Sequence, residues 1–80
     1  VNGDLMSKFV ICIDNEGNPA SLILGKVYRL LPDDKAASHH LLRILDEDKS
    51  EPEGYLYPES MFVPIDLPKR AEQALLAETA

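Results

Sequence analysis

Residues that interrupt regular secondary structure occur so often that short strands fit this sequence better than long helices. Six prolines and four glycines divide the 80 residues into short pieces. The pieces between these breaks are rich in aliphatic, β-branched and aromatic residues, and turn-forming residues stand between them. The pattern predicts five strands, at residues 9–13, 25–31, 40–46, 54–57 and 61–65. Five short strands separated by turns are typical of a small barrel or sandwich.

The segments between the predicted strands are expected to be turns and polar loops. Residues 34–39 contain two alanines and are expected to form one helical turn. Residues 58–60 are typical of a single 3₁₀ turn. Residues 47–53 are acidic and include Pro52, which predicts a solvated loop.

The last segment, residues 66–80, is predicted to be a short helix. Pro68 stands near its first helical position, where proline is well tolerated. Lys69 and Arg70 follow in the first turn, where the helix dipole disfavours positive charge. The apolar stripe is thin and isolated helices of this length are marginal, so we expect fraying unless the barrel or a partner covers the leucines. The expected domains are a flexible tail at 1–7, a β-barrel at 8–65 and this helix at 66–80.

The charge balance argues against two classes of partner. Fourteen acidic and eight basic side chains give a formal net charge of −6. Nucleic acids bind proteins through Lys and Arg side chains that displace counterions, and anionic membranes attract the same side chains. The longest basic run is Lys69-Arg70. We therefore expect a protein partner, with no nucleic acid and no membrane.

The single cysteine predicts where the protein resides. Cys12 has no second cysteine to pair with, whereas small secreted domains usually depend on several disulfides. No run of about 18 apolar residues could span a membrane, and the first residues lack the pattern of a signal peptide. We expect a cytoplasmic protein.

The cysteine and the two histidines suggest a thiol nucleophile or a metal site, but each has a simpler structural explanation. Cys12 with His39 or His40 has the composition of a thiol nucleophile and its base. Cys12, however, lies within an apolar strand, where a free cysteine usually acts as a small hydrophobe. His39 and His40 are adjacent, so on a strand they would point to opposite faces and would not both reach one metal ion.

Acidic residues at alternate positions suggest a calcium-binding loop, but the other residues of an EF-hand loop are missing. Asp46, Asp48 and Ser50 alternate as ligands do in an EF-hand loop. That loop needs glycine at its sixth position and glutamate at its twelfth, where this chain has Glu51 and Tyr57. We therefore expect no catalytic activity, no cofactor and no metal.

The segment that closes the predicted barrel resembles the same part of SH3 domains. There, a glycine and apolar strand residues lead into proline, a 3₁₀ turn, an aromatic residue and valine; here the segment is Gly54-Tyr55-Leu56-Tyr57-Pro58-Glu59-Ser60-Met61-Phe62-Val63. With Cys12-Ile13-Asp14-Asn15 and Leu24-Gly25-Lys26-Val27-Tyr28, it is similar to small uncharacterised bacterial and phage proteins with SH3-like barrels. The resemblance covers residues 8–65 and implies a mainly β fold, a small five-stranded SH3-like barrel with a short C-terminal helix.

The sequence departs from peptide-binding SH3 domains in its aromatic residues. Those domains line their groove with a tryptophan and several tyrosines, on which proline-rich ligands stack. This chain has no tryptophan. Met61 stands where the family has an aromatic residue, and Phe62 follows one place later.

The tyrosines provide the main functional hypothesis. Tyr55 and Tyr57 are two residues apart, so on a strand they share a face. If that face is exposed and Leu56 points inward, they form a protein-binding patch with Tyr28 or Phe62, because tyrosine suits interfaces. In the simpler interpretation, the tyrosines cover the core and keep their hydroxyls in water. The resulting prediction is a small non-catalytic protein-interaction module.

An alternative function would act through charge. An acidic regulator or inhibitor would occupy a basic, nucleic-acid-binding surface of another protein. It requires the carboxylates of residues 46–53 to share a face with those of 14–16 or 33–34. A homodimer is a further option, because edge strands can pair across a two-fold axis and the C-terminal helix can dock on a neighbour.

Overall fold

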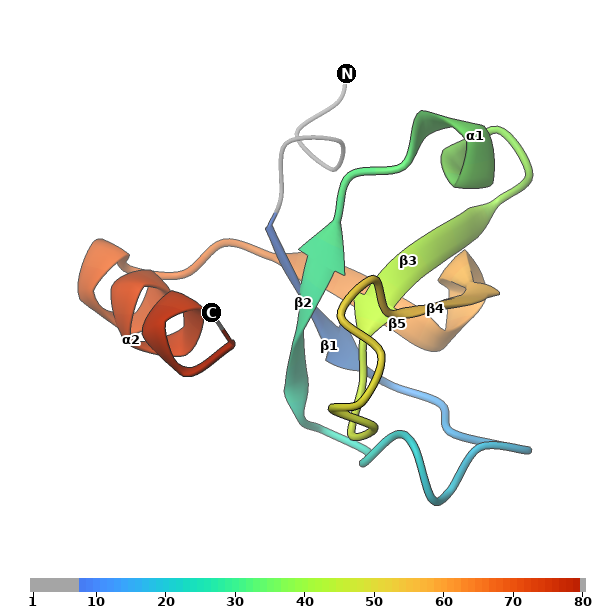
Figure 1. Cartoon of the computed structure of the whole chain (residues 1–80), viewed down its shortest axis with the longest axis horizontal. Helices are drawn as coiled ribbons and strands as arrows, with labels where there is room; N and C mark the ends of the chain where they lie inside the picture. Colours follow the sequence, from blue (N-terminus) through green and yellow to red (C-terminus); the bar gives the residue numbers. More distant parts are fainter. Residues whose placement is uncertain (1–7, 80) are drawn as a thin grey trace.

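A computed structural model describes residues 8–79, and within this range the structure is mainly β (Figure 1). The elements are, in order, β1 (Phe9–Cys12), β2 (Val27–Leu31), α1 (Asp34–Ala37), β3 (Leu41–Leu45), β4 (Tyr55–Pro58), η2 (Glu59–Met61), β5 (Phe62–Ile65) and α2 (Lys69–Thr79). All five predicted strands are confirmed, each within two residues of its expected bounds. The short helical turn, the 3₁₀ turn and the C-terminal helix are confirmed as well. The expected tail at 1–7 lies outside the described residues.

The strands form one antiparallel sheet in the order β4-β3-β2-β1-β5. The first strand lies between β2 and β5, so the last strand returns to pair beside the first. In residues 8–79 no backbone pairing joins the two edge strands, β4 and β5, and the sheet is therefore open. The structure thus confirms the mainly β fold as a five-stranded antiparallel sheet with a short C-terminal helix.

One face of this sheet holds the core. Side chains alternate between the two faces of a strand, and the register brings alternate residues of all five strands to the same side. Tyr57 and Phe62 meet there edge to face, with 5.9 Å between ring centroids. Cys12 is buried in this cluster, as predicted for a small hydrophobe. The buried cluster comprises Val10, Cys12, Leu22, Tyr28, Ile44, Tyr57, Met61 and Phe62.

The loop between β1 and β2 covers one end of the core. Leu22 lies in this loop and is fully buried. The Asn15 side-chain amide donates to the Leu22 carbonyl at 3.1 Å. The Glu47 N–H, two residues past the end of β3, donates to the Ser21 carbonyl at 3.0 Å. The first bond holds the loop in its folded shape, and the second holds it at the end of the sheet where β3 finishes.

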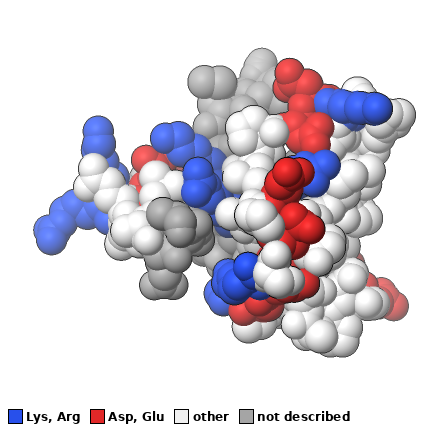
Figure 2. Space-filling view, in the orientation of Figure 1, with Lys and Arg blue, Asp and Glu red and all other residues white. Residues whose placement is uncertain are grey.

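Charge is unevenly distributed over the surface. Lys and Arg side chains extend from the α2 side of the molecule, and others stand beside α1 and among the acidic side chains (Figure 2). Most of the visible Asp and Glu side chains lie toward α1 and the loop between β3 and β4. α2 itself lies beside the sheet (Figure 1), where Glu72 approaches Lys8 with 3.8 Å between the charged atoms. No helix of residues 8–79 has the length and apolar character needed to cross a membrane.

Gly54 is the position where the fold requires the absence of a side chain. Its φ is +70°, and a Cβ there would stand 2.4 Å from the Ile44 carbonyl oxygen. Gly54→Ala should lower the free energy of unfolding by about 3 kcal/mol, since the left-handed backbone and the steric clash both add a cost. Gly17→Ala is the matched control, because its φ is +84° but nothing lies within 4 Å of the added carbon. Urea denaturation should show the larger loss at Gly54; equal losses would contradict the close approach to Ile44.

Candidate functional site

The predicted aromatic patch is not an exposed surface. Tyr28, Tyr57 and Phe62 have only 3%, 6% and 4% of their surface exposed, whereas Tyr55 has 41%. Tyr55 and Tyr57 do share a face, but it is the core face. The register explains this, because Tyr57 lies opposite Leu42 on the core face while Leu56 lies opposite Arg43 on the outer face. The expected arrangement, with the tyrosines outward and Leu56 inward, was wrong.

The tyrosine hydroxyls instead bind the acidic loop that follows β3. The Tyr57 hydroxyl donates to Asp46 at 2.5 Å, and the Tyr28 hydroxyl donates to Glu47 at 2.6 Å. The Tyr55 hydroxyl donates to Asp48 at 2.9 Å. Three consecutive carboxylates therefore each accept a hydrogen bond from one tyrosine hydroxyl, and these bonds hold the loop against the sheet.

Burial and these carboxylates stabilise the neutral form of the tyrosines. Burial, with the Asp46 hydrogen bond, raises the pKa of Tyr57 from 10.0 to about 12. Burial also raises the pKa of Tyr28, and the bond to Glu47 adds to the effect. The pKa of Glu47 is lowered by its hydrogen bonds from Lys26 and Tyr28. These groups are structural acceptors and donors, because the pairing holds each of them in its ordinary charge state at neutral pH.

Asp46 is a buried carboxylate at the start of the acidic loop. Only 2% of its surface is exposed, and it accepts hydrogen bonds from Tyr57 and from the Asp48 N–H. Among residues 8–79 no three His, Cys, Asp or Glu side chains are grouped to hold a metal ion. Cys12 lies in the core, whereas His39 and His40 lie in the exposed turn after α1, so the suggested thiol and base are not brought together.

Removing the Tyr57 hydroxyl should destabilise the fold. Tyr57→Phe leaves the buried Asp46 carboxylate without its side-chain donor, which should lower the free energy of unfolding by about 2 kcal/mol. Tyr55→Phe removes the equivalent bond at an exposed site and should have a much smaller effect. Denaturant titration of both variants would show this difference, and an unchanged Tyr57→Phe midpoint would mean that water satisfies Asp46.

The raised pKa of Tyr57 predicts a loss of stability in alkali. A group whose pKa is higher in the folded state stabilises fully below its unfolded pKa, and this contribution disappears as pH rises through the folded value. The contribution of Tyr57 should therefore fall between pH 10.0 and about 12. In denaturation curves, the stability difference between the wild type and Tyr57→Phe should shrink over this window. A constant difference would contradict the shift.

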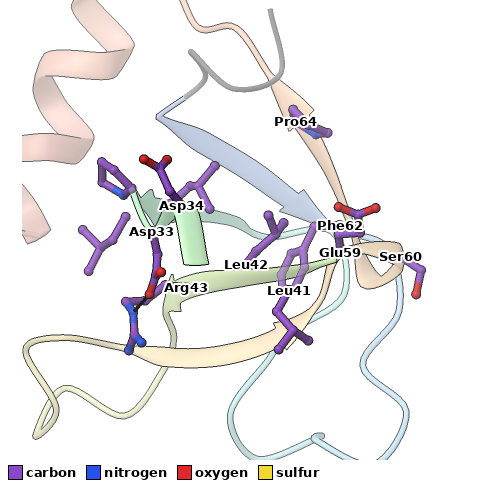
Figure 3. A pocket seen from close by; sticks show the side chains of 12 residues that line it. Asp33, Asp34, Leu41, Leu42, Arg43, Glu59, Ser60, Phe62 and Pro64 are labelled. Carbon is purple, nitrogen blue, oxygen red and sulfur yellow. Dashed lines mark hydrogen bonds and ion pairs between the residues drawn. The ribbon is translucent and has the colours of Figure 1, made fainter. Parts of the chain in front are cut away.

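A groove opens at the other end of the core face (Figure 3). Its volume is about 440 Å³, and it lies at the start of β3, away from the end that Leu22 covers. Leu30, Leu42, Phe62 and Pro64 form its apolar lining on the core face of the sheet. Leu30 and Leu42 pack on the buried cluster but are only half-buried. The groove is thus a continuation of the core that no other segment of residues 8–79 covers.

The polar rim of the groove is predominantly acidic. Asp33 caps α1 by accepting from the Ala36 N–H at 2.9 Å, and its other oxygen accepts from Arg43 at 2.8 Å. The Ala36 N–H, followed by Arg43, lowers the pKa of Asp33, so this carboxyl stays ionised. Asp34 and Glu59 stand at opposite sides of the groove (Figure 3).

His40 stands beside this rim in an uncommon backbone conformation. Its φ of +59° is the left-handed conformation, which histidine adopts more readily than most non-glycine residues. Its ring Nδ1 lies 3.3 Å from a Glu59 oxygen, and the Glu59 N–H donates to the His40 carbonyl at 3.0 Å. The turn after α1 therefore positions Glu59 at the edge of the groove.

Of the four predicted site residues, the structure brings one to this groove. Phe62 lines it, while Tyr28, Tyr55 and Tyr57 serve the core and the acidic loop. The remaining lining residues were missed, although the sequence held one signal for them. Leu30 and Leu42 alternate with Tyr28 and Ile44, the core residues of their strands.

Comparison with protein-family models, with curated proteins and with solved structures found no match for this chain. The groove and its rim therefore provide the evidence about function.

Proposed function

We propose that this chain is a small, non-catalytic protein-interaction module whose partner binds in the groove between α1 and η2. The observation that supports this most is the apolar lining itself. Half-buried Leu30 and Leu42 continue the core to the surface, and a contact with another protein would remove them from water, which is the main favourable term in association. Polar groups around an apolar centre are the usual composition of such interfaces.

The proposal leaves out catalysis because Asp33 and Arg43, which pair at the rim of the groove, have structural partners. Asp33 and Arg43 bind each other, and a carboxyl with a lowered pKa is a poor general acid at neutral pH. The Cys12 thiol is buried in the core and is not among the residues that line the groove. Recognition therefore explains this arrangement better than proton transfer does.

An SH3-like barrel and a cytoplasmic location belong to the same proposal. The order β4-β3-β2-β1-β5 and the η2 turn before β5 support the fold, since both agree with the resemblance noted in the sequence. A single cysteine, which is buried and free, supports a reducing compartment. A protein of this kind acts through contact, with its specificity set by the few groups at the groove.

Photo-crosslinking tests the groove as the binding surface. A photoreactive amino acid at Ser60, on the exposed rim, should give a discrete adduct in cells that express the protein natively. The same amino acid at Ala20, an exposed small residue of the β1–β2 loop, is the control and should give none. Ser60→Trp, introduced alone, should reduce partner binding at least tenfold by filling the groove, whereas Ala20→Trp should not. Equal adducts at the two positions would contradict the proposal.

One contact favours the acidic regulator as a second candidate. Arg43 donates to Asp33 at 2.8 Å and to the Glu53 carbonyl at 3.3 Å, so the acidic turn before α1 and the acidic loop before β4 lie on either side of one guanidinium. A partner bound by this surface would be released at about 0.5 M salt, where charges are screened over a few ångströms. A complex held by the apolar groove would persist in that salt and be lost in Ser60→Trp.

A further inference from the structure

The size of the groove limits what can enter it. Its volume is about 440 Å³, which lies in the range of small, specific pockets and holds a few side chains rather than a folded surface. A partner in this space therefore contributes a short segment with a small number of apolar side chains.

The charge at the rim selects among such segments. Among the described residues that line the groove, Arg43 is the one basic residue, against Asp33, Asp34 and Glu59. It is already bound to Asp33 and to the Glu53 carbonyl. Asp34 has no side-chain hydrogen bond or ion pair within residues 8–79, and Glu59 faces a histidine that is charged only when protonated. The groove therefore presents two available carboxylates, one at each side of its apolar lining (Figure 3).

We infer that the groove binds a short protein segment in which apolar side chains are flanked by Lys or Arg on both sides. This inference rests on the proposed function and adds the chemistry of the ligand. The apolar side chains enter between Leu42 and Phe62, and the flanking cations meet Asp34 and Glu59. An acidic segment is repelled by the same rim, so the charges provide specificity while apolar burial provides most of the affinity.

We assign the bound segment to a different protein rather than to a second copy of this chain. α2 has a related composition, with Lys69 and Arg70 before Leu75 and Leu76. Both leucines are already half-buried within their own chain, so docking α2 into a neighbour would first uncover them.

Selection from a displayed library of random peptides tests this ligand chemistry. The full chain is the bait, and Ser60→Trp is the counter-selection bait that removes peptides bound elsewhere. Enriched peptides should share apolar residues with Lys or Arg on both sides. Enrichment of acidic or uncharged peptides that still require an open groove would overturn the inference and leave the proposed function standing. Peptides that bind the wild type and Ser60→Trp equally would overturn both.

Charge reversal then tests the two carboxylates with one enriched peptide. Asp34→Lys and Glu59→Lys should each weaken its binding about five- to tenfold in fluorescence anisotropy, because attraction at a partly exposed site is replaced by repulsion. Glu16→Lys makes the same charge change in the exposed β1–β2 loop and should leave the affinity within twofold. A peptide with its flanking cations changed to Glu should bind the Asp34→Lys/Glu59→Lys variant more tightly than the wild type. Failure of this rescue, in variants with unchanged thermal melting, would overturn the inference.

Light scattering of the same proteins tests whether a second copy of this chain occupies the groove. A monomer at all concentrations agrees with a ligand from another protein. A dimer that Ser60→Trp and Glu59→Lys both dissociate would assign the groove to a second copy and overturn the inference.

Discussion

The hydrogen bond from Tyr57 to the buried Asp46 is the contact on which the position of the acidic loop depends. It joins the core face of the edge strand β4 to the point where β3 ends and the acidic loop begins. A buried carboxylate is costly without donors, so the loop is stable only in the position that places Asp46 beneath Tyr57. Tyr28 and Tyr55 repeat the same contact with the next two carboxylates, which extends the constraint along the loop.

This constraint leaves the two ends of the core unequal. At the end where β3 finishes, the tyrosine contacts and the bond from Glu47 to Ser21 hold two loops together, and Leu22 fills the space between them. At the other end, residues 8–79 provide only the four-residue α1, which is too short to cover Leu30 and Leu42. Within residues 8–79, the exposed part of the core forms the groove that we propose as the binding surface.

The strands could be predicted because their signal is local. Apolar runs such as residues 9–12, bounded by turn residues, form strands whatever their neighbours, and Pro58 and Pro68 marked the start of the 3₁₀ turn and of α2. The direction of Tyr57 could not be predicted in this way. Alternation shows that Tyr55 and Tyr57 share a face, but either face satisfies it, and a one-residue change of register exchanges them.

The groove was harder to predict than the core, because it exists where no segment of residues 8–79 packs over Leu30 and Leu42. Leu42 has the same local pattern as the fully buried Ile44 on the same strand. Their different exposure depends on where a distant loop ends, and Glu59 reaches the rim through contacts with His40, which is 19 residues earlier in the chain.

By itself, the sequence determined a mainly β chain with five short strands, a buried cysteine and an acidic surface, since these follow from composition and from residues close together in the chain. The tertiary structure alone decided that Tyr28 and Tyr57 face inward, that Asp46 is buried and that, within residues 8–79, a groove with acidic sides remains open. Each of these depends on contacts between residues far apart in sequence, where the burial of one group is set by the position of another.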